Sequence, residues 1–143
     1  MSSDFSNEAY ENFNSVIVYK KRAIQIFSAS KKRFSSFATL VAKYKNELGP
    51  NVSVFCMAIP IGSDFYLPPS FKKDREKNSI NYLYSTMNPS IKCVKAYDEL
   101  EKHQNEYIQF NTDHHWTGRG AYYAYLAFCN SAAVINFTWA AGA

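Results

Sequence analysis

The chain has 143 residues, of which 47% are hydrophobic and 20% are charged, and its formal net charge is +4. This length suits one compact domain, and the hydrophobic content excludes an intrinsically disordered chain. The sequence contains no run of about 18 apolar residues, so it predicts no membrane-spanning helix.

The N-terminal part of the sequence divides into a polar segment and a first strand. Residues 1–14 are polar and acidic, and we expect them to be poorly ordered and not to be a signal peptide. Residues 15–143 are expected to belong to one domain. Ser15–Tyr19 contains three consecutive β-branched residues and predicts a strand, which Ala23–Phe27 either extends or pairs with as a hairpin.

Positive charge is concentrated in one stretch that has no acid between Glu11 and Glu47. Such a stretch could bind an anionic glycan, a membrane surface or nucleic acid. We favour an ordinary solvated surface, and expect no nucleic-acid partner, because no base-stacking or groove-reading motif accompanies the charges. The cluster of charge within this stretch consists of Lys20, Lys21, Arg22, Lys31, Lys32 and Arg33.

The middle of the chain alternates between helix and strand patterns. Apolar residues recur at helical spacing up to Leu48, and this helix is expected to start near Ser30 and to stop at Gly49 and Pro50. Val52–Pro60 is nearly continuous in apolar residues, which is typical of a strand covered on both faces. The predicted buried face of the helix consists of Phe34, Phe37, Val41, Tyr44 and Leu48, and after the strand we expect a loop at Ile61–Ser70 and a helix at Lys72–Met87.

The remaining elements continue this alternation. We expect short strands at Ile91–Ala96 and Tyr107–Phe110, a short helix at Tyr97–Gln104, and a longer helix from Thr117 to about Ala132. Alternation of this kind predicts an α/β fold with a mostly parallel sheet and helices on both faces.

One short segment carries acid and imidazole groups between a predicted strand and a predicted helix. Asp113 and His115 are two residues apart, so on extended backbone their side chains project to the same side, while His114 points away. A carboxylate beside an imidazole fixes its tautomer and stabilises its charged form, as a general base requires. Thr117 is expected to cap the following helix.

Two other uses of this segment remain open. The first is a purely structural capping cluster, and the second is a metal site formed by the aspartate and the histidines. Metal sites usually need three or four ligands, and the nearest further histidine, His103, lies ten residues before Asp113. We therefore expect no metal and no other cofactor.

The three cysteines, Cys56, Cys93 and Cys129, are far apart and form no C-x-x-C pair. We expect them to be buried free thiols.

The run from Tyr107 to Tyr125, YIQFNTDHHWTGRGAYYAY, resembles the signature of the DHHW family of bacterial cell-envelope proteins. Its D-x-H-W core is similar to that of alginate O-acetylation proteins, which are SGNH-hydrolase-like. The upstream segments Ala58–Pro60, Asp64–Pro68 and Asn81–Tyr84 also resemble the family's pattern. The resemblance covers about residues 15–129, and it implies a partial SGNH-hydrolase-like three-layer fold.

The resemblance assigns the acid and the base of a catalytic triad but not its nucleophile. The family's aspartate and histidine correspond to Asp113 and His115. Its serine lies in a later Asp-Ser segment, which residues 130–143 do not contain, so we expect a C-terminally truncated chain that is inactive alone. Ser63, in the order Gly-Ser-Asp, is an alternative nucleophile, but a loop or turn residue is favoured there.

The intact protein is expected, from the resemblance, to be an O-acetyltransferase or esterase acting on envelope glycans. We expect the loop at Ile61–Ser70 to line the same cleft as Asp113 and His115, with Tyr66 and Asp64 binding substrate. In a competing arrangement, the aromatic residues of this loop cover the core.

A different class of function is a non-catalytic glycan-binding or envelope-assembly protein that has the same fold. The chain could also be a fragment that does not fold stably, because a sheet without its later strands exposes an edge. The resemblance implies an extracytoplasmic or cell-surface location, although the missing signal peptide leaves a cytoplasmic location open.

Overall fold

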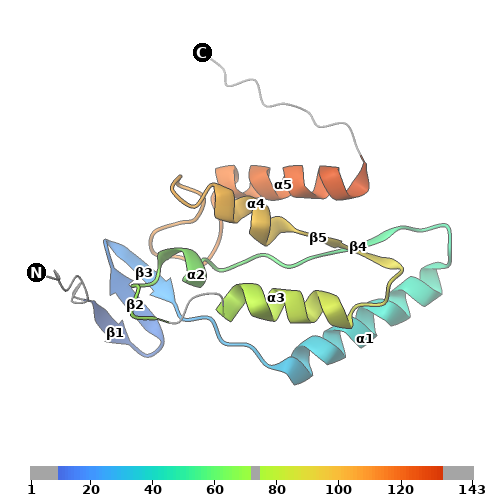
Figure 1. Cartoon of the computed structure of the whole chain (residues 1–143), viewed down its shortest axis with the longest axis horizontal. Helices are drawn as coiled ribbons and strands as arrows, with labels where there is room; N and C mark the ends of the chain where they lie inside the picture. Colours follow the sequence, from blue (N-terminus) through green and yellow to red (C-terminus); the bar gives the residue numbers. More distant parts are fainter. Residues whose placement is uncertain (1–9, 72–74, 134–143) are drawn as a thin grey trace, which may run out of the picture.

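The chain has a mixed α/β fold with two separate sheets (Figure 1). The structure is a computed structural model, and it describes residues 10–71 and 75–133. Within these residues, one sheet is antiparallel with three strands and the other is parallel with two. The elements in chain order are β1 (Glu11–Phe13), β2 (Val16–Tyr19), β3 (Arg22–Gln25), α1 (Lys31–Leu48), β4 (Val54–Met57), α2 (Ser63–Tyr66), α3 (Arg75–Thr86), β5 (Ile91–Val94), α4 (Ala96–Lys102) and α5 (Gly118–Ala132).

The antiparallel sheet is a three-stranded meander at the N-terminal side of the molecule. β2 and β3 form the hairpin that was one of the two possibilities for this region, with Val16 opposite Gln25. The exposed residues Lys20 and Lys21 make its turn with φ angles of 46° and 62°, the left-handed conformation that two-residue hairpin turns favour. The prediction of a poorly ordered segment is wrong for Glu11–Phe13, because these residues pair with β2 as strand β1.

The parallel sheet consists of β4 and β5, with Val54 opposite Ile91, and α3 lies on the connection between them. A strand–helix–strand unit was predicted here and is confirmed. The prediction of a mostly parallel sheet is not confirmed, because the three-stranded sheet is antiparallel. In the part of the chain that the structure describes, Tyr107–Phe110 does not join a sheet either, and Gln109 instead forms an isolated bridge with Trp116, just after the histidines.

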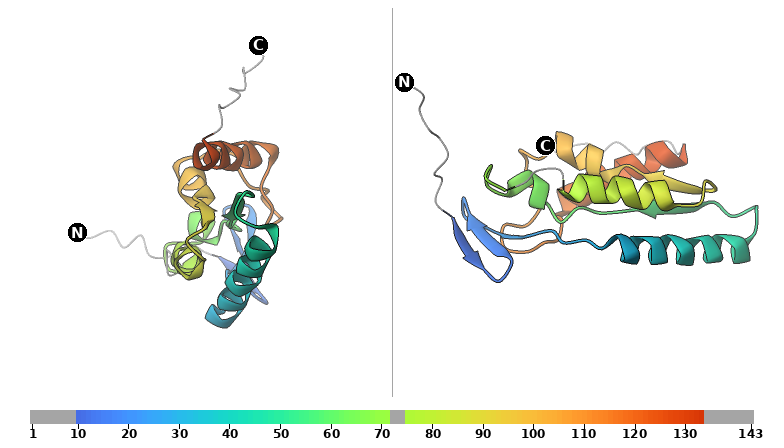
Figure 2. Two further views of the ribbon diagram at one scale, coloured as in Figure 1. Left: turned by 90° about the vertical axis from the view of Figure 1, so that its right-hand side faces the viewer. Right: turned by 60° about the horizontal axis from the view of Figure 1, so that its bottom comes forward.

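Helices cover both faces of the β4–β5 pair (Figure 2). On one face, α1 and α3 pack over a buried apolar cluster. On the other face, the ring of Phe55 meets that of Phe128 from α5, with centroids 5.1 Å apart. The cluster consists of Ala38, Cys56, Leu83, Met87 and Ile91.

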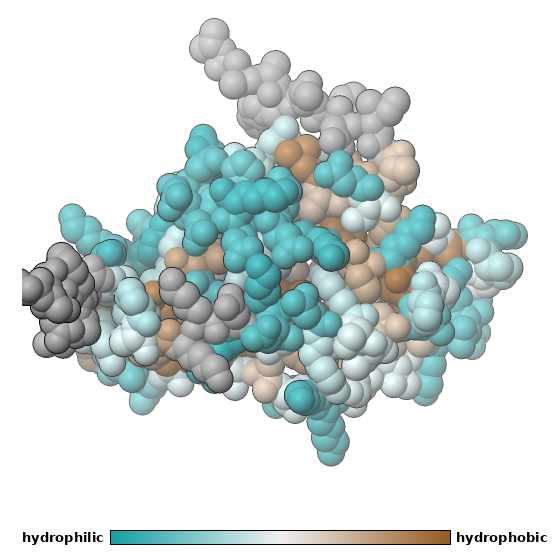
Figure 3. Space-filling view, in the orientation of Figure 1, coloured by the Kyte–Doolittle hydropathy of each residue, from teal (hydrophilic) through white to brown (hydrophobic). Residues whose placement is uncertain are grey.

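Helix α1 buries less of its apolar surface than the sequence predicted. Phe37, Tyr44 and Leu48 are 46%, 60% and 51% exposed, and the buried residue of the helix is Ala38. The helix is therefore confirmed, but its predicted buried face is wrong in part, because the described residues cover only the stripe around Ala38. Hydrophobic residues reach the surface elsewhere too, as the brown areas of Figure 3 show.

Two further elements differ from the predictions. The strand predicted at Val52–Pro60 pairs only over Val54–Met57, and Met57 is 37% exposed instead of covered on both faces. The loop predicted at Ile61–Ser70 contains the four-residue helix α2. The start of the helix predicted at Lys72 and the segment 134–143 lie outside the described residues. Among the helices that the structure describes, none has the length and apolarity needed to cross a membrane.

Candidate functional site

Residues 107–117 form a hairpin-like loop that carries the acid and both histidines. Gln109 makes an antiparallel bridge with Trp116, and the backbone N–H of Phe110 donates to the carbonyl oxygen of His115 at 3.2 Å. Residues directly opposite each other in such a pairing project to the same face. Phe110 and His115 therefore share one face of the loop, and Gln109 and Trp116 share the other.

The loop is fixed to the rest of the molecule at both ends. The side chain of Thr117 accepts the N–H of Gly120 at 3.3 Å, which confirms the predicted cap of α5. Gly120 packs closely, since a Cβ atom there would lie 2.2 Å from the carbonyl oxygen of Ile108. Near the tip, the carbonyl oxygen of Asn111 accepts the N–H of Ala23 from β3 at 2.7 Å. These contacts hold the tip in place without using the side chains of the acid and the histidines.

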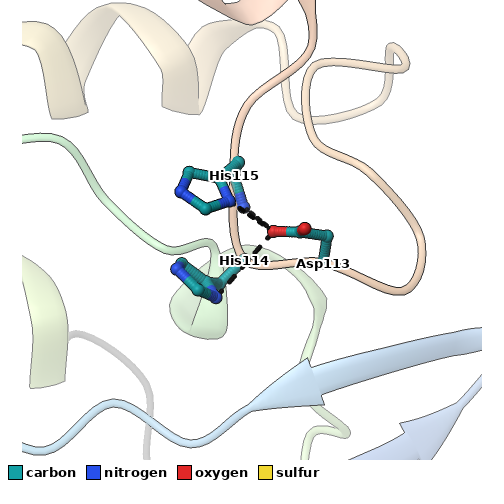
Figure 4. A group of neighbouring side chains, drawn as sticks. All are labelled: Asp113, His114 and His115. Atoms are coloured by element: carbon teal, nitrogen blue, oxygen red, sulfur yellow. Dashed lines mark hydrogen bonds and ion pairs between the residues drawn. The ribbon is translucent and has the colours of Figure 1, made fainter.

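Asp113 and His115 lie together, as their spacing predicted (Figure 4). The Nδ1 atom of His115 is 2.6 Å from Oδ1 of Asp113, and the backbone N–H of His115 donates to the same oxygen at 2.8 Å. Both bonds lower the pKa of the Asp113 carboxyl below its ordinary value, and the bond from the backbone N–H has the larger effect. The side chains are 52% and 66% exposed, so the pair is open to solvent and to a substrate.

His114 does not point away, and that prediction is wrong. Its Nδ1 atom lies 3.8 Å from Oδ1 of Asp113, and its ring is tilted against that of His115 with centroids 4.2 Å apart. The prediction assumed extended backbone, whereas the chain bends at these residues, which places consecutive side chains on the same side.

Asp64, predicted to bind substrate, holds a helix in the structure. Its Oδ2 atom accepts the backbone N–H groups of Glu76 and Lys77 at 3.0 and 2.9 Å, in the first turn of α3. The hydroxyl of Tyr97 donates to the same oxygen at 3.2 Å. These contacts do not support a substrate-binding role, because they direct the carboxylate into the protein.

Tyr66, the other predicted substrate-binding residue, packs against the core of the N-terminal sheet. The guanidinium of Arg22 lies 4.0 Å from the centre of its ring and covers one face of it. Its hydroxyl oxygen is buried without a hydrogen-bond partner among the described residues, and burial raises the pKa of this hydroxyl. The contacts favour the arrangement in which loop aromatics cover the core.

The segment after β4 nevertheless touches the histidine loop through Gln109. The buried side chain of Gln109 donates to the carbonyl oxygen of Pro60 at 2.8 Å. Gly62 has a φ of 83°, and a Cβ atom there would lie 1.6 Å from Oε1 of Gln109, so only glycine fits. The two segments are neighbours on the face opposite His115, and a cleft shared with Asp113 stays a prediction.

A buried carboxyl group, which the sequence did not indicate, lies beside Ser63. Glu76 is 1% exposed; its side chain accepts the N–H of Ile61 and lies 3.3 Å from the Ser63 hydroxyl, which donates to it. Burial raises the pKa of Glu76 to about 7. Ser63 is equally buried, so its hydroxyl is occupied within the protein and is not placed as a nucleophile. A glutamate in an amphipathic helix is normally a surface residue, so the sequence held no signal for this burial.

An exposed aromatic pair, which the sequence did not indicate either, lies on the segment that leads to the histidines. Tyr107 and Phe110 are 50% and 47% exposed, and their rings meet edge to face with centroids 6.2 Å apart. Aromatic residues at this spacing could equally have been core residues. Phe110 shares its face of the loop with His115, so an apolar surface adjoins the acid–imidazole pair.

Comparison with known proteins identifies similar chains. A family model described as DHHW protein matches residues 1–138. A DHHW family protein from Eubacterium siraeum has 30% identity and a TM-score of 0.79, over 90% of this chain and 44% of that chain. No curated protein matches the sequence.

Two structures of Bacillus cereus PatB1 have a similar fold. The one with a sulfonyl adduct has 19% identity and a TM-score of 0.66, over 84% of this chain and 43% of that chain. The other has 18% identity and a TM-score of 0.60, over 87% and 42%. The chain thus spans less than half the length of each of these structures.

Proposed function

Because the chain belongs to the DHHW family, we propose that it supplies the acid and base of an acyl-transfer site. The proposed whole is an SGNH-hydrolase-like protein of the bacterial cell envelope, located outside the cytoplasm. It would act as an O-acetyltransferase or esterase on glycans. His115 is the proposed general base, and Asp113 orients its ring.

The hydrogen bond between Asp113 and His115 is the observation that carries this proposal. When Nδ1 of His115 bears a proton, it donates to Oδ1 of Asp113 over 2.6 Å and leaves Nε2 as the acceptor. An imidazole in this tautomer accepts the proton of a hydroxyl nucleophile, and the carboxylate stabilises the imidazolium that forms. The ring is 66% exposed, which leaves room for a nucleophile and a substrate beside it.

The nucleophile in this proposal is a serine outside residues 1–143. Ser63 is buried and bonded to Glu76, which argues against it. In the proposed reaction the serine oxygen attacks the ester carbonyl, His115 takes its proton, and the alcohol leaves with a proton returned by His115.

The test is hydrolysis of a small acetyl ester such as 4-nitrophenyl acetate. We expect this chain alone to show only background hydrolysis, since it lacks the proposed nucleophile. In the longest natural protein that contains the chain, His115→Ala should lower kcat/KM about a thousandfold or more, and Asp113→Asn should also lower it strongly. The matched control is His103→Asn, a histidine at the C-cap of α4 that bonds Glu106 outside the loop, which should leave kcat/KM within a factor of about two.

Two results would contradict the proposal. The first is full activity of the His115→Ala variant in a correctly folded longer protein. The second is robust turnover by this chain alone that Ser63→Ala abolishes, because it would place the nucleophile at Ser63.

A non-catalytic glycan-binding role is the second candidate function, and the exposed pair of Tyr107 and Phe110 favours it. Sugars stack their C–H faces on exposed aromatic rings, so this pair would bind a glycan chain next to His115 whether or not acyl transfer occurs. The glycan-binding role and the catalytic role can be distinguished in the Tyr107→Ala variant by measuring its binding of acetylated and deacetylated oligosaccharides. Loss of binding with unchanged hydrolysis of 4-nitrophenyl acetate would separate the glycan surface from the catalytic pair.

A further inference from the structure

The turn that brings His114 toward Asp113 assembles three metal-binding side chains at one place. The ligand atoms of Asp113, His114 and His115 all lie within 4.8 Å of one another (Figure 4). We propose that these three residues bind one divalent transition-metal ion of the kind that imidazole and carboxylate ligands prefer, such as Ni²⁺, Zn²⁺ or Cu²⁺.

The spacing of the three groups fits a single ion. With metal–ligand bonds of about 2.0–2.1 Å, neighbouring ligand atoms of a tetrahedral site are about 3.3 Å apart. The Nδ1 atoms of His115 and His114 lie 2.6 and 3.8 Å from Oδ1 of Asp113, on either side of that value. Small rotations of the two exposed rings therefore bring three donors to one ion, and the open side of the site leaves positions for water.

The backbone prepares this arrangement. Both ends of the loop are bonded to each other through Gln109, Trp116 and Phe110, and the carbonyl of Asn111 is bonded to β3. Less conformational entropy is lost on binding when the ligands are already held close together. A mobile tail with the same three residues would lack this advantage.

A second histidine with acidic neighbours shows what the proposed site requires. His103 faces Glu106 with Nδ1 at 2.8 Å and Glu99 with Nε2 at 3.7 Å. The two carboxylates lie beside different nitrogens of the ring, so a single metal ion cannot contact one ring nitrogen and both carboxylates at once. A metal site therefore requires more than histidines and carboxylates close in sequence: the ligand atoms must converge on one point, as they do around Asp113.

Metal binding and general-base catalysis exclude each other at His115, a consequence that rests on the proposed function. An ion that takes the Nδ1 lone pair replaces the proton that bonds to Asp113, and an ion that takes Nε2 blocks the proton acceptor. A bound ion would thus inhibit acyl transfer instead of assisting it. The binding itself does not depend on whether the protein is an enzyme.

Calorimetric titration of the untagged chain with Ni²⁺ at pH 7.5 tests the proposal. We expect one ion per chain, and His114→Asn should weaken binding more than about tenfold, since even groups behind the ligands typically carry 10–100-fold in affinity. The matched control His103→Asn should leave the affinity within about twofold.

A paramagnetic readout locates the ion independently of folding defects in the variants. Ni²⁺ should broaden the NMR signals of residues 111–116 in the wild-type chain before those around His103. Absence of Ni²⁺ binding by the wild-type chain would overturn the proposal, as would unchanged affinity in a folded His114→Asn variant or broadening centred on His103. No ester is used in these measurements, so failure of the acyl-transfer proposal leaves this result unaffected.

Discussion

Asp64 and Asp113 are both aspartates near the start of a helix, but the protein uses them in different ways. Asp64 accepts two backbone N–H groups of α3 and the hydroxyl of Tyr97, next to the buried Glu76. Among the described residues, Asp113 accepts hydrogen bonds only from His115, within its own exposed loop. One carboxylate joins distant segments, and the other orients a single imidazole.

The difference shows how surroundings decide the role of a carboxylate. Around Asp64, the donors come from α3 and α4, twelve or more residues further along the chain, so the bonds contribute to the fold. Around Asp113, the loop is fixed by main-chain bonds and by the close packing of Gly120. The side chains of Asp113 and the two histidines are therefore not needed to hold the loop in place. Stability should therefore depend on the Asp64 region and activity on the Asp113 region.

The largest expected effect is a pH dependence of the folding stability that comes from Glu76, the buried carboxyl beside Asp64. Burial raises the pKa of Glu76 from its ordinary value of 4.5 to about 7. The folded state thus binds its proton more tightly than the unfolded state, so stability is fully present below about pH 4.5 and is lost as pH rises to about 7. The loss is on the order of 3 kcal/mol for a shift of this size. Urea unfolding between pH 4.5 and 8.5 measures it.

Glu76→Gln provides the matched comparison for this pH dependence. The amide keeps an oxygen for the N–H of Ile61 and offers N–H groups to Ser63, but it cannot ionise. The variant should resemble the wild type at pH 4.5 and be more stable than it at pH 8.5. A wild-type stability that rises over this range would show that the carboxyl is not held in its neutral form.

A pair of glycines in α5 tests whether packing fixes the Asp113 loop. Gly120→Ala should cost about 1–3 kcal/mol, because the new Cβ atom would lie 2.2 Å from the backbone oxygen of Ile108, which must move. Gly118→Ala is the matched control, since a Cβ atom there meets nothing within 4 Å and alanine favours helix by up to about 1 kcal/mol. Thermal unfolding of both variants measures the difference, and equal stabilisation by both would show that the loop does not depend on this contact.

Local patterns predicted several elements well but not the environment of individual side chains. The helix after Ser30, its glycine stop at Gly49 and the cap at Thr117 follow from short-range rules, and the structure confirms the helix, its end and the cap. The predicted contact between Asp113 and His115 is present at 2.6 Å, although the backbone there is bent and not extended as the prediction assumed. Tertiary contacts decide the rest: the strand predicted at Tyr107–Phe110 folds back on its own loop.

The site was predictable to the same extent. The sequence predicted that Asp113 and His115 lie together, as they do, but it placed His114 on the wrong side because the backbone bends there. It assigned Asp64 and Tyr66 to substrate binding because loop residues often bind ligands. It could not show that α3 would bring its N–H groups to Asp64 or that Arg22 would cover Tyr66, because both contacts join segments far apart in the chain.

The smallest expected effect is the change in folding stability when Asp64 or Asp113 is replaced. Asp64→Ala removes the acceptor of two N–H groups in the first turn of α3 and should lower the free energy of unfolding by about 1–2 kcal/mol. Asp64→Asn should recover most of this loss, since its amide oxygen still accepts those bonds. Asp113→Ala should leave the stability unchanged within error, because its bonds lie within an exposed loop. Urea unfolding at pH 7 compares the three variants, and a loss for Asp113→Ala as large as that for Asp64→Ala would remove the distinction between the two regions.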